Sequence, residues 1–292
     1  MTDKNNSKSR SVDDLKLSRR DLPAPAVAAR LDQAASNGTV WKVAKPRIGA
    51  MLGACKTILQ DLEDRHAVLA EQTDLDLTGY SRGSAVWLLS GRLIGLHRAL
   101  LIQVEAGIDG EALVTGRAIH EGARVLYAFG VPDADDLVRK WLDDAGRHGY
   151  VKQKAAREAH DRFEKQVDDA LAAQGLPTFG RTSELTEEMY DRMSRAAHNR
   201  RSSCMASVNE STRRMTYGVQ SDPFRRGATV TWAAAMTAEV INAVGDSLRA
   251  LYGSDDYFSK QIAPLQRALW AVRDEFRLDR KSLIMDAGLA DS

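Results

Sequence analysis

Two hydroxyl groups and one imidazole fall on a single helical stripe near the middle of the sequence. Tyr190, Ser194 and His198 are spaced four residues apart, so a helix through this segment would place all three on one face. An imidazole titrates near neutral pH and can act as a general acid or base. Arg195 and Arg201 lie three residues before and after His198 and could stabilise charge on a reacting phosphate. The pattern predicts acid–base chemistry on a phosphate, with His198 and Arg195 catalytic and with Tyr190, Ser194 and Arg201 holding the substrate.

The segment around this stripe is rich in arginine. Residues 190–226 contain eight Arg, no Lys and three acidic residues, which gives a local charge of +5. The planar fork of arginine matches the geometry of a phosphate, so we expect Arg200 and Arg201 to contact a nucleotide or RNA. Two structural alternatives remain open. His198 could be a buried histidine bonded to its helical neighbours, and the arginines could face solvent or pair with the acidic residues at 133–144.

A second polar face occurs earlier in the chain, where Arg117, Glu121 and Arg124 lie within two helical turns. If this helix packs beside the segment that carries His198, Glu121 is the natural partner of His198 or Arg195. Glu121 is therefore a candidate catalytic residue and Arg117 a candidate substrate-binding residue. The alternative is that the Arg117–Glu121 pair ties two helices together without touching any ligand.

Apolar residues recur every three or four positions through most of the chain, which is the pattern of amphipathic helices. The repeats lie at residues 46–66, 84–104, 111–129, 186–201, 228–251 and 257–276, with a more charged helical stretch from 132 to 173. Pro46 is expected in the first turn of the first helix. No segment alternates with a period of two residues. The sequence predicts an all-α bundle of about six to eight helices, with a long Arg-rich loop at 202–227 that includes a short extended piece at 215–219.

Charge and composition indicate one globular domain. Lys+Arg number 41 and Asp+Glu 40, so any basic surface must be local. We expect a single helical domain at 41–280, a disordered or weakly ordered extension at 1–40 and a flexible tail at 281–292. The first 22 residues contain no apolar core of a signal peptide. Cys55 and Cys204 are the only two cysteines and lie far apart, which favours a reducing compartment, so we expect a cytoplasmic protein without a membrane partner.

Metal and cofactor signatures are poorly represented. Only Glu63 and His66 have the Glu-x-x-His spacing of a di-iron bundle. His120 and Glu121 begin an HExxH-like pattern, but position 124 is Arg instead of the second His. The sequence has neither a Walker-type phosphate loop nor a GxSxG motif. We therefore expect no metal and no cofactor.

Three features between residues 83 and 252 resemble an uncharacterised bacterial helical family related to the HEPN group of RNA-cutting and nucleotide-binding domains. The first is the Gly-containing turn and helix at 106–130, the second is the stripe at 189–198, and the third is the polar loop followed by a long late helix. The resemblance implies a compact helical bundle that binds RNA or nucleotide phosphates. It also implies metal-independent endoribonuclease activity in a defence or toxin role.

HEPN ribonucleases are similar in placing an Arg, about four to six residues, and then a His, and Arg192 with His198 fits this spacing. Arg192 is therefore a further catalytic candidate. By chance alone about two such spacings are expected among 29 Arg and 6 His, and Arg92 with His97 is a second instance. On a continuous helix Arg192 and His198 would lie about 120° out of phase. Arg195 and Arg201 are the better partners on that geometry.

A competing hypothesis needs no chemistry. The same polar residues could hold a bundle together, and the apolar helices could serve a homodimer or a protein partner. In that case the chain is a non-catalytic helical interaction module.

Overall fold

The structure, a computed structural model, describes residues 24–72, 81–130, 134–142, 222–252 and 262–289 as continuous stretches. It also describes short pieces at 158, 161–162, 165, 169, 173, 193–194, 208–209, 214–215 and 260. Within these residues the chain forms seven helices and one pair of two-residue strands. The prediction of an all-α multi-helix bundle is confirmed.

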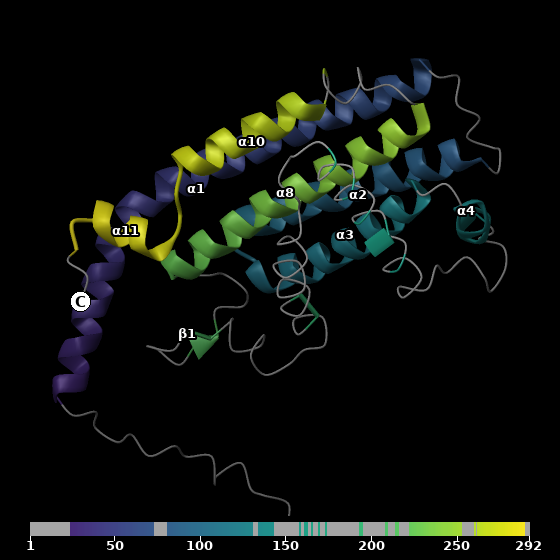
Figure 1. The fold of residues 1–292 in the computed structure, drawn as a ribbon. Coiled ribbons are helices and arrows are strands. Elements are labelled where there is room, and N and C mark those ends of the chain that lie inside the picture. The colour runs from purple at the N-terminus through teal and green to yellow at the C-terminus, as the bar shows by residue number, and fades with distance from the viewer. Residues whose placement is uncertain are drawn as a thin grey trace, which may run out of the picture.

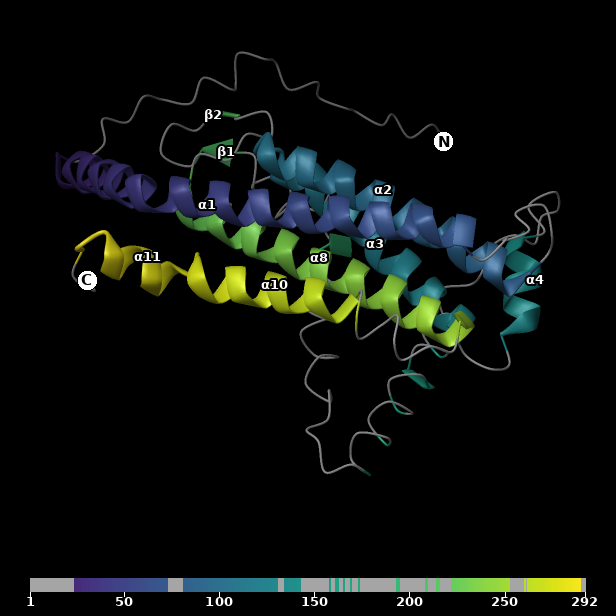
Figure 2. The same cartoon turned by 90° about the horizontal axis from the view of Figure 1, so that it is seen from above.

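The helices in chain order are α1 (Ala24–Gln72), α2 (Arg82–Glu105), α3 (Asp109–Gly130), α4 (Asp135–Leu142), α8 (Pro223–Tyr252), α10 (Ala263–Glu275) and α11 (Arg280–Asp286). The strands β1 (Val208–Asn209) and β2 (Arg214–Met215) pair antiparallel within the segment expected as the Arg-rich loop. Four long helices, α1, α2, α3 and α8, pack lengthwise around one core, and α10 covers α1 and α8 (Figures 1 and 2). In Figure 1, α10, α8 and α3 lie side by side on the near face of the bundle.

Contacts between helices fix the direction in which each one runs. His97 of α2 lies 2.8 Å from the Thr237 hydroxyl of α8, and Arg226 of α8 reaches the carbonyl of Glu105, so α2 and α8 are antiparallel. At the other end of the bundle the Ser247 hydroxyl of α8 donates to the carbonyl of Leu126 in α3. Because Arg226 also contacts the first residue of α3, α3 and α8 run parallel. Because α3 and α8 run parallel, residues at the same distance from the start of each helix lie next to each other.

The first helix is longer than the sequence suggested. Pro46, which was expected in the first turn, lies inside α1, and the helix already begins at Ala24. Val40 and Ala44 are fully buried, so the apolar stripe that contains Ile48 simply continues on the other side of the proline. Packing against the bundle therefore offsets the missing backbone donor of Pro46. The predicted start of this helix was wrong because a proline inside a packed helix looks the same as one at its beginning.

The second half of α1 is joined to α2 by a reciprocal pair of aromatic side chains. His66 stacks on Trp87 with ring centroids 4.9 Å apart. The His66 Nε2 group donates to the Trp87 carbonyl at 2.9 Å, and the Trp87 indole donates to the His66 carbonyl at 3.2 Å. Burial lowers the pKa of His66, against the opposing effect of this hydrogen bond. Both residues serve the α1–α2 junction.

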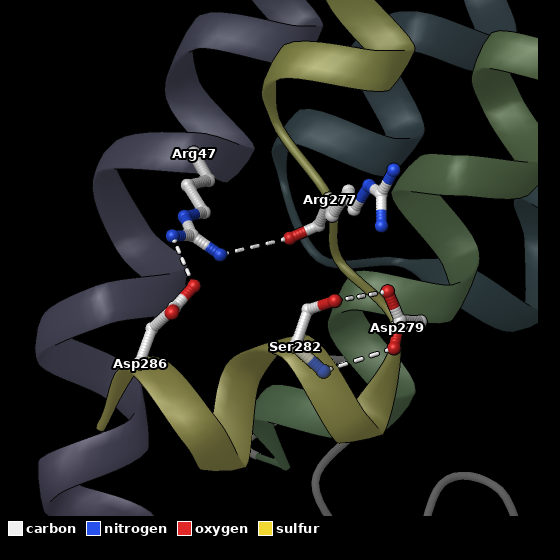
Figure 3. Close-up of polar contacts among 5 residues, drawn as sticks. All are labelled: Arg47, Arg277, Asp279, Ser282 and Asp286. Carbon is white, nitrogen blue, oxygen red and sulfur yellow. Dashed lines mark hydrogen bonds and ion pairs between the residues drawn. The ribbon is translucent and has the colours of Figure 1, made fainter. Parts of the chain in front are cut away.

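A short helix occupies part of the stretch expected as a flexible tail. The α11 segment buries Leu283 completely, and Asp279 caps its first turn by accepting from the Ser282 backbone at 2.9 Å. Arg47 of α1 donates to the carbonyl of Arg277 at 3.1 Å and to Asp286 at 2.6 Å (Figure 3). This bridge and the burial of Leu283 fasten residues 280–286 to α1 and the core. The expected tail therefore begins later than residue 281.

The start of α8 also differs from the expectation. The helix begins at Pro223 rather than at residue 228, because Asp222 accepts a hydrogen bond from the Phe224 backbone at 2.9 Å and Pro223 occupies the first helical position. Residues 223–227 of the expected loop are therefore helical. The last long helix, α10, runs over Ala263–Glu275 within the predicted range of 257–276.

By length and apolar composition, α2 is the one helix of the described residues that could cross a membrane. Half of its most apolar window is buried inside the bundle, where Leu93, Leu100 and Leu101 are among the least exposed side chains. The apolar character of α2 thus corresponds to its place in the protein core.

A close contact between α3 and α8 gives a testable prediction for the packing. A Cβ atom on Gly116 would clash with the Trp232 ring, whereas one on Gly53 of α1 would meet nothing within 4 Å. Gly116→Ala is expected to lower the free energy of unfolding by about 1–3 kcal/mol, because the indole must move out of a packed interface. Gly53→Ala is the matched control and should raise it by about 0.5–1 kcal/mol. Urea denaturation of both variants checks this, and equal effects of the two substitutions would contradict the packing.

Candidate functional site

Three of the nine residues predicted for a site lie within the described part of the chain. Arg117 and Glu121 of α3 form an ion pair, in which Arg117 Nε donates to Glu121 Oε1 at 2.8 Å. Ser194 is helical and half-buried, and Met193 beside it is fully buried in the core. The other six predicted residues lie outside the described residues: Tyr190, Arg192, Arg195, His198, Arg200 and Arg201. Their expected arrangement stays a prediction.

The same face of α3 carries a histidine that the sequence analysis did not select. Nδ1 of His120 is hydrogen-bonded to Oε1 of Glu239 in α8, and only 2% of the His120 side chain is exposed. A carboxylate oxygen accepts, so Nδ1 of His120 donates to Glu239, and Nε2, the other ring nitrogen, is buried. A carboxylate that fixes the tautomer of a histidine in this way is the arrangement used to position a general base.

Two arginines lie within two turns of this histidine on α3. Arg117 precedes His120 by three residues and Arg124 follows it by four, so all three project from one side of the helix. Arg124 is 9% exposed and Arg117 is half-buried beside Glu121. Guanidinium groups at partly buried positions can stabilise an anion more strongly than they would in water. The α3 face therefore combines a positioned imidazole with two permanent cations.

Sequence reasoning missed His120 and Glu239 for a clear reason. In the sequence His120 stands only at the start of an incomplete HExxH motif, and Glu239 belongs to no recognisable motif. The two residues are 119 positions apart, and only the parallel packing of α3 on α8 brings them together. A polar residue on the buried face of each of two predicted helices was the available signal.

The outer surface of α8 lies between α3 and α10. Glu239, Asn242 and Asp246 follow one another at helical spacing on this surface, and Ala235 one turn earlier is exposed. Gln266 of α10 donates to Asn242, one turn after Glu239. His120 therefore lies beneath the outer surface of α8, and its partner Glu239 is 18% exposed. This α8 surface has α3 on one side and α10 on the other (Figure 1).

Asp246 lies at the far end of this α8 surface, where burial disfavours the ionised form of its carboxyl group. Burial raises the pKa of Asp246 to about 6, although the nearby charge of Arg249 acts in the opposite direction. A raised folded-state pKa means that the stability contributed by this group is complete below about pH 4 and is lost as the pH rises through about 6. Asp246→Asn removes this pH-dependent loss of stability, because asparagine does not ionise. The substitution is expected to stabilise the protein by about 1–2 kcal/mol at pH 8 and to have no effect near pH 4.

Thermal unfolding of wild type and Asp246→Asn between pH 4 and pH 8 measures this difference. Asp279 provides a control of opposite sign, since its hydrogen bonds to Ser282 lower its pKa. Its stabilising effect appears as the pH rises above about 4, so Asp279→Asn should lose stability relative to wild type toward higher pH. A constant gain for Asp246→Asn across the whole pH range would show that its charge is not the cause.

The buried end of the Arg-rich segment has a structural role. Arg226 donates to Asp109 Oδ1 at 2.8 Å and to the Glu105 carbonyl at 3.2 Å, while the Thr229 hydroxyl donates to Asp109 Oδ2 at 2.9 Å. Burial raises the pKa of Asp109 to about 6, against the lowering by Arg226 and Thr229, so the carboxylate is ionised at pH 7. The pair clamps the start of α8 to the turn between α2 and α3. Arg226 is therefore not available to a phosphate, and its partner is Asp109 instead of the acidic residues at 133–144.

His97, the other histidine with an arginine nearby in sequence, lies deep in the core. It is fully buried and bonds the Thr237 hydroxyl at 2.8 Å, and burial lowers its pKa to about 3. The Thr237 hydroxyl itself donates to the Ala233 carbonyl at 3.0 Å, so Nε2 of His97 must be the donor in the bond between them. This histidine fastens α2 to α8 and has no carboxylate partner among the described residues.

Among the described residues no group of three His, Cys, Asp or Glu side chains could hold a metal ion. The His120–Glu239 pair and its two arginines are thus the polar cluster of the described chain best suited to acid–base chemistry. Comparison of the whole chain with models of protein families, with curated proteins and with solved structures gives no match.

Proposed function

We propose that this chain is a helical protein that binds RNA or nucleotide phosphates and cleaves RNA without a metal, in a defence or toxin role, within the cytoplasm. The catalytic centre in this proposal is His120 of α3 with its carboxylate partner Glu239 of α8. Arg117 and Arg124 bind the phosphate on either side of His120. The observation that carries the proposal is the hydrogen bond from His120 Nδ1 to Glu239 between two arginines on one helix face.

The chemistry follows from these side chains. In this proposal the strand must reach Nε2 of His120, which is buried in the free protein. Nε2 then takes the proton from a ribose 2′-hydroxyl, whose oxygen attacks the adjacent phosphorus. The bond from phosphorus to the 5′-oxygen breaks, and that oxygen receives a proton as it leaves. The products are a 2′,3′-cyclic phosphate and a 5′-hydroxyl. Charge develops on the phosphate oxygens in the transition state, and guanidinium groups held nearby stabilise that charge.

His198 keeps a place in the proposal. If Tyr190, Ser194 and His198 share a helix face as expected, His198 supplies the second acid–base group, which protonates the leaving 5′-oxygen. Arg192, Arg195, Arg200 and Arg201 then add to the phosphate-binding side chains. Glu121 holds Arg117 in place through the 2.8 Å ion pair, so it has a positioning role.

The test is RNA cleavage by the purified protein in excess EDTA, with mass spectrometry of the products. We expect cleavage in EDTA and fragments that end in a 2′,3′-cyclic phosphate, because attack by the neighbouring hydroxyl needs no metal. Absence of cleavage, or fragments with a 3′-hydroxyl and a 5′-phosphate, would contradict the proposal.

A second candidate function is a non-catalytic interaction or homodimerisation module. The observation that favours it is the exposure of two apolar side chains on neighbouring helices, Ile102 of α2 at 58% and Val114 of α3 at 45%. Exposed aliphatic side chains can mark a protein interface when they form a patch. Light scattering at increasing protein concentration, combined with the cleavage assay, separates the two candidates. A protein that dimerises and cleaves no RNA would support the second candidate, the non-catalytic interaction module.

A further inference from the structure

An exposed tryptophan on α10 carries an arginine stacked on its ring. Trp270 is 44% exposed, and the Arg273 guanidinium lies 4.1 Å from the ring centroid. The Arg273 side chain is itself 47% exposed. Trp270 is the largest side chain among the exposed hydrophobic residues of the described chain. A large ring at the surface is costly to leave in water, whereas both an indole and a guanidinium plane can stack with a nucleobase.

The register of α10 on α8 places this stack at the height of the candidate catalytic pair. The two helices run antiparallel, since Gln266 contacts Asn242 and Ile262 packs on Gly245. Trp270 is one turn after Gln266, and Glu239 is one turn before Asn242. Trp270 and Glu239 are therefore level along the bundle axis, on the neighbouring helices α10 and α8.

Cationic side chains follow the stack in both directions along the chain. Arg267 is exposed one turn before Trp270. Beyond α10, Arg277 and Lys281 line a hollow of about 650 Å³ between the C-terminal segment and α1. Four acidic side chains also line this hollow, and three of them already have partners. Asp286 bonds Arg47 and Asp279 bonds Ser282 (Figure 3), and Asp274 lies 3.7 Å from the Arg273 guanidinium.

We propose that the Trp270–Arg273 stack is a platform for an unpaired nucleobase, with Arg267, Arg277 and Lys281 receiving the phosphates on either side of that base. The ligand is a nucleotide, either free or within single-stranded RNA. The platform rests on the proposed function, because its register would place a bound strand beside Glu239, the partner of His120. Trp270 contacts the base, and the stack selects for an unpaired base without selecting its identity.

The test measures binding separately from cleavage. The probe is a labelled single-stranded RNA of about 10 nucleotides with 2′-O-methyl groups, a length within the range of known single-strand sites. The methyl groups remove the attacking hydroxyl, so the strand cannot be cut. Binding is followed by fluorescence anisotropy in EDTA. We expect Trp270→Ala to weaken binding about 10-fold or more and Trp270→Phe to retain most of it, because a smaller ring still stacks.

Matched controls separate the stack from general surface effects. Val68→Ala removes an apolar side chain of the same exposure, 44%, on α1 and should leave binding unchanged. Lys281→Gln should reduce the slope of log affinity against log salt by about 0.7, the value for one phosphate contact on a single strand. Arg92→Gln removes an exposed cation of α2 and should leave that slope unchanged. Trp270 is exposed on a surface helix, so its variants should unfold at the wild-type temperature.

Each outcome supports or contradicts the proposal that Trp270 and Arg273 bind a nucleobase. Equal binding of wild type and Trp270→Ala overturns it and leaves the catalytic proposal in place. Equal affinity for the strand and for its duplex also overturns it, since paired bases cannot stack on the ring. Competition by AMP that depends on Trp270 supports the platform and identifies a free nucleotide as a ligand. If wild type binds neither the strand nor AMP, the platform and the RNA-binding function both fail.

Discussion

Replacing His120 with glutamine is expected to slow RNA cleavage in EDTA by about 100- to 10,000-fold, the usual contribution of one general acid or base. Glutamine can donate from its amide to Glu239, so the contact between α3 and α8 has a replacement, but an amide cannot take up a proton at neutral pH. Single-turnover cleavage of a labelled RNA measures the effect. Urea denaturation of the variant shows whether the loss of rate exceeds any loss of folded protein.

The partner residue and the competing histidine provide the controls for this prediction. Glu239→Gln should slow the same step, and the double variant should be little slower than His120→Gln alone, because the two side chains act as a unit. His198→Ala tests the group expected from the sequence. Full activity of His120→Gln together with loss of activity in His198→Ala would move the catalytic centre to the 190–201 segment. Unchanged cleavage by both variants would remove the catalytic proposal altogether.

The second large effect is expected on stability. Arg226→Met should lower the free energy of unfolding by about 3–5 kcal/mol at pH 8, because it leaves the buried Asp109 carboxylate without its cation. Methionine keeps the aliphatic bulk, so the change is mainly one of charge and hydrogen bonds. The pKa of Asp109 is already raised to about 6 by burial, and loss of Arg226 removes a lowering influence. Asp109 in the variant should therefore take up a proton more readily, and the cost should shrink as the pH falls toward 5.

Denaturation of Arg225→Met provides the matched comparison. Arg225 precedes Arg226, is 46% exposed and faces Asp222 at 3.8 Å, so its replacement should cost less stability than that of the buried Arg226. Asp109→Leu combined with Arg226→Met should cost less than Arg226→Met alone, since no charge is then left buried without a partner. A loss below about 1 kcal/mol for Arg226→Met at pH 8 would contradict the clamp between α8 and the α2–α3 turn.

The helices could be predicted well where their apolar stripe was continuous, and less well at their ends. The predicted ranges 84–104 and 111–129 agree closely with α2 and α3. The predicted starts of α1 and α8 were both wrong, and a proline is involved in each case, Pro46 and Pro223. The first is inside a helix that tertiary packing maintains, and the second begins a helix whose first turn was taken for a loop. Leu283 shows a third cause, because a seven-residue helix has little stability of its own and forms where its one buried side chain meets the core.

The sequence by itself determined that this protein is an α-helical bundle, because the three-to-four residue spacing of apolar side chains depends only on helical pitch. It also placed Arg117 and Glu121 within reach of each other, since ion pairs one turn apart are local. Only the tertiary structure decided which distant residues meet. His120 with Glu239 and Asp109 with Arg226 are each more than one hundred positions apart, and the level placement of Trp270 with Glu239 depends on the direction of α10 along α8. Periodicity tells which face of a helix is buried, but the partner of that face follows from packing the whole chain, and the chemistry of this protein lies in those pairings.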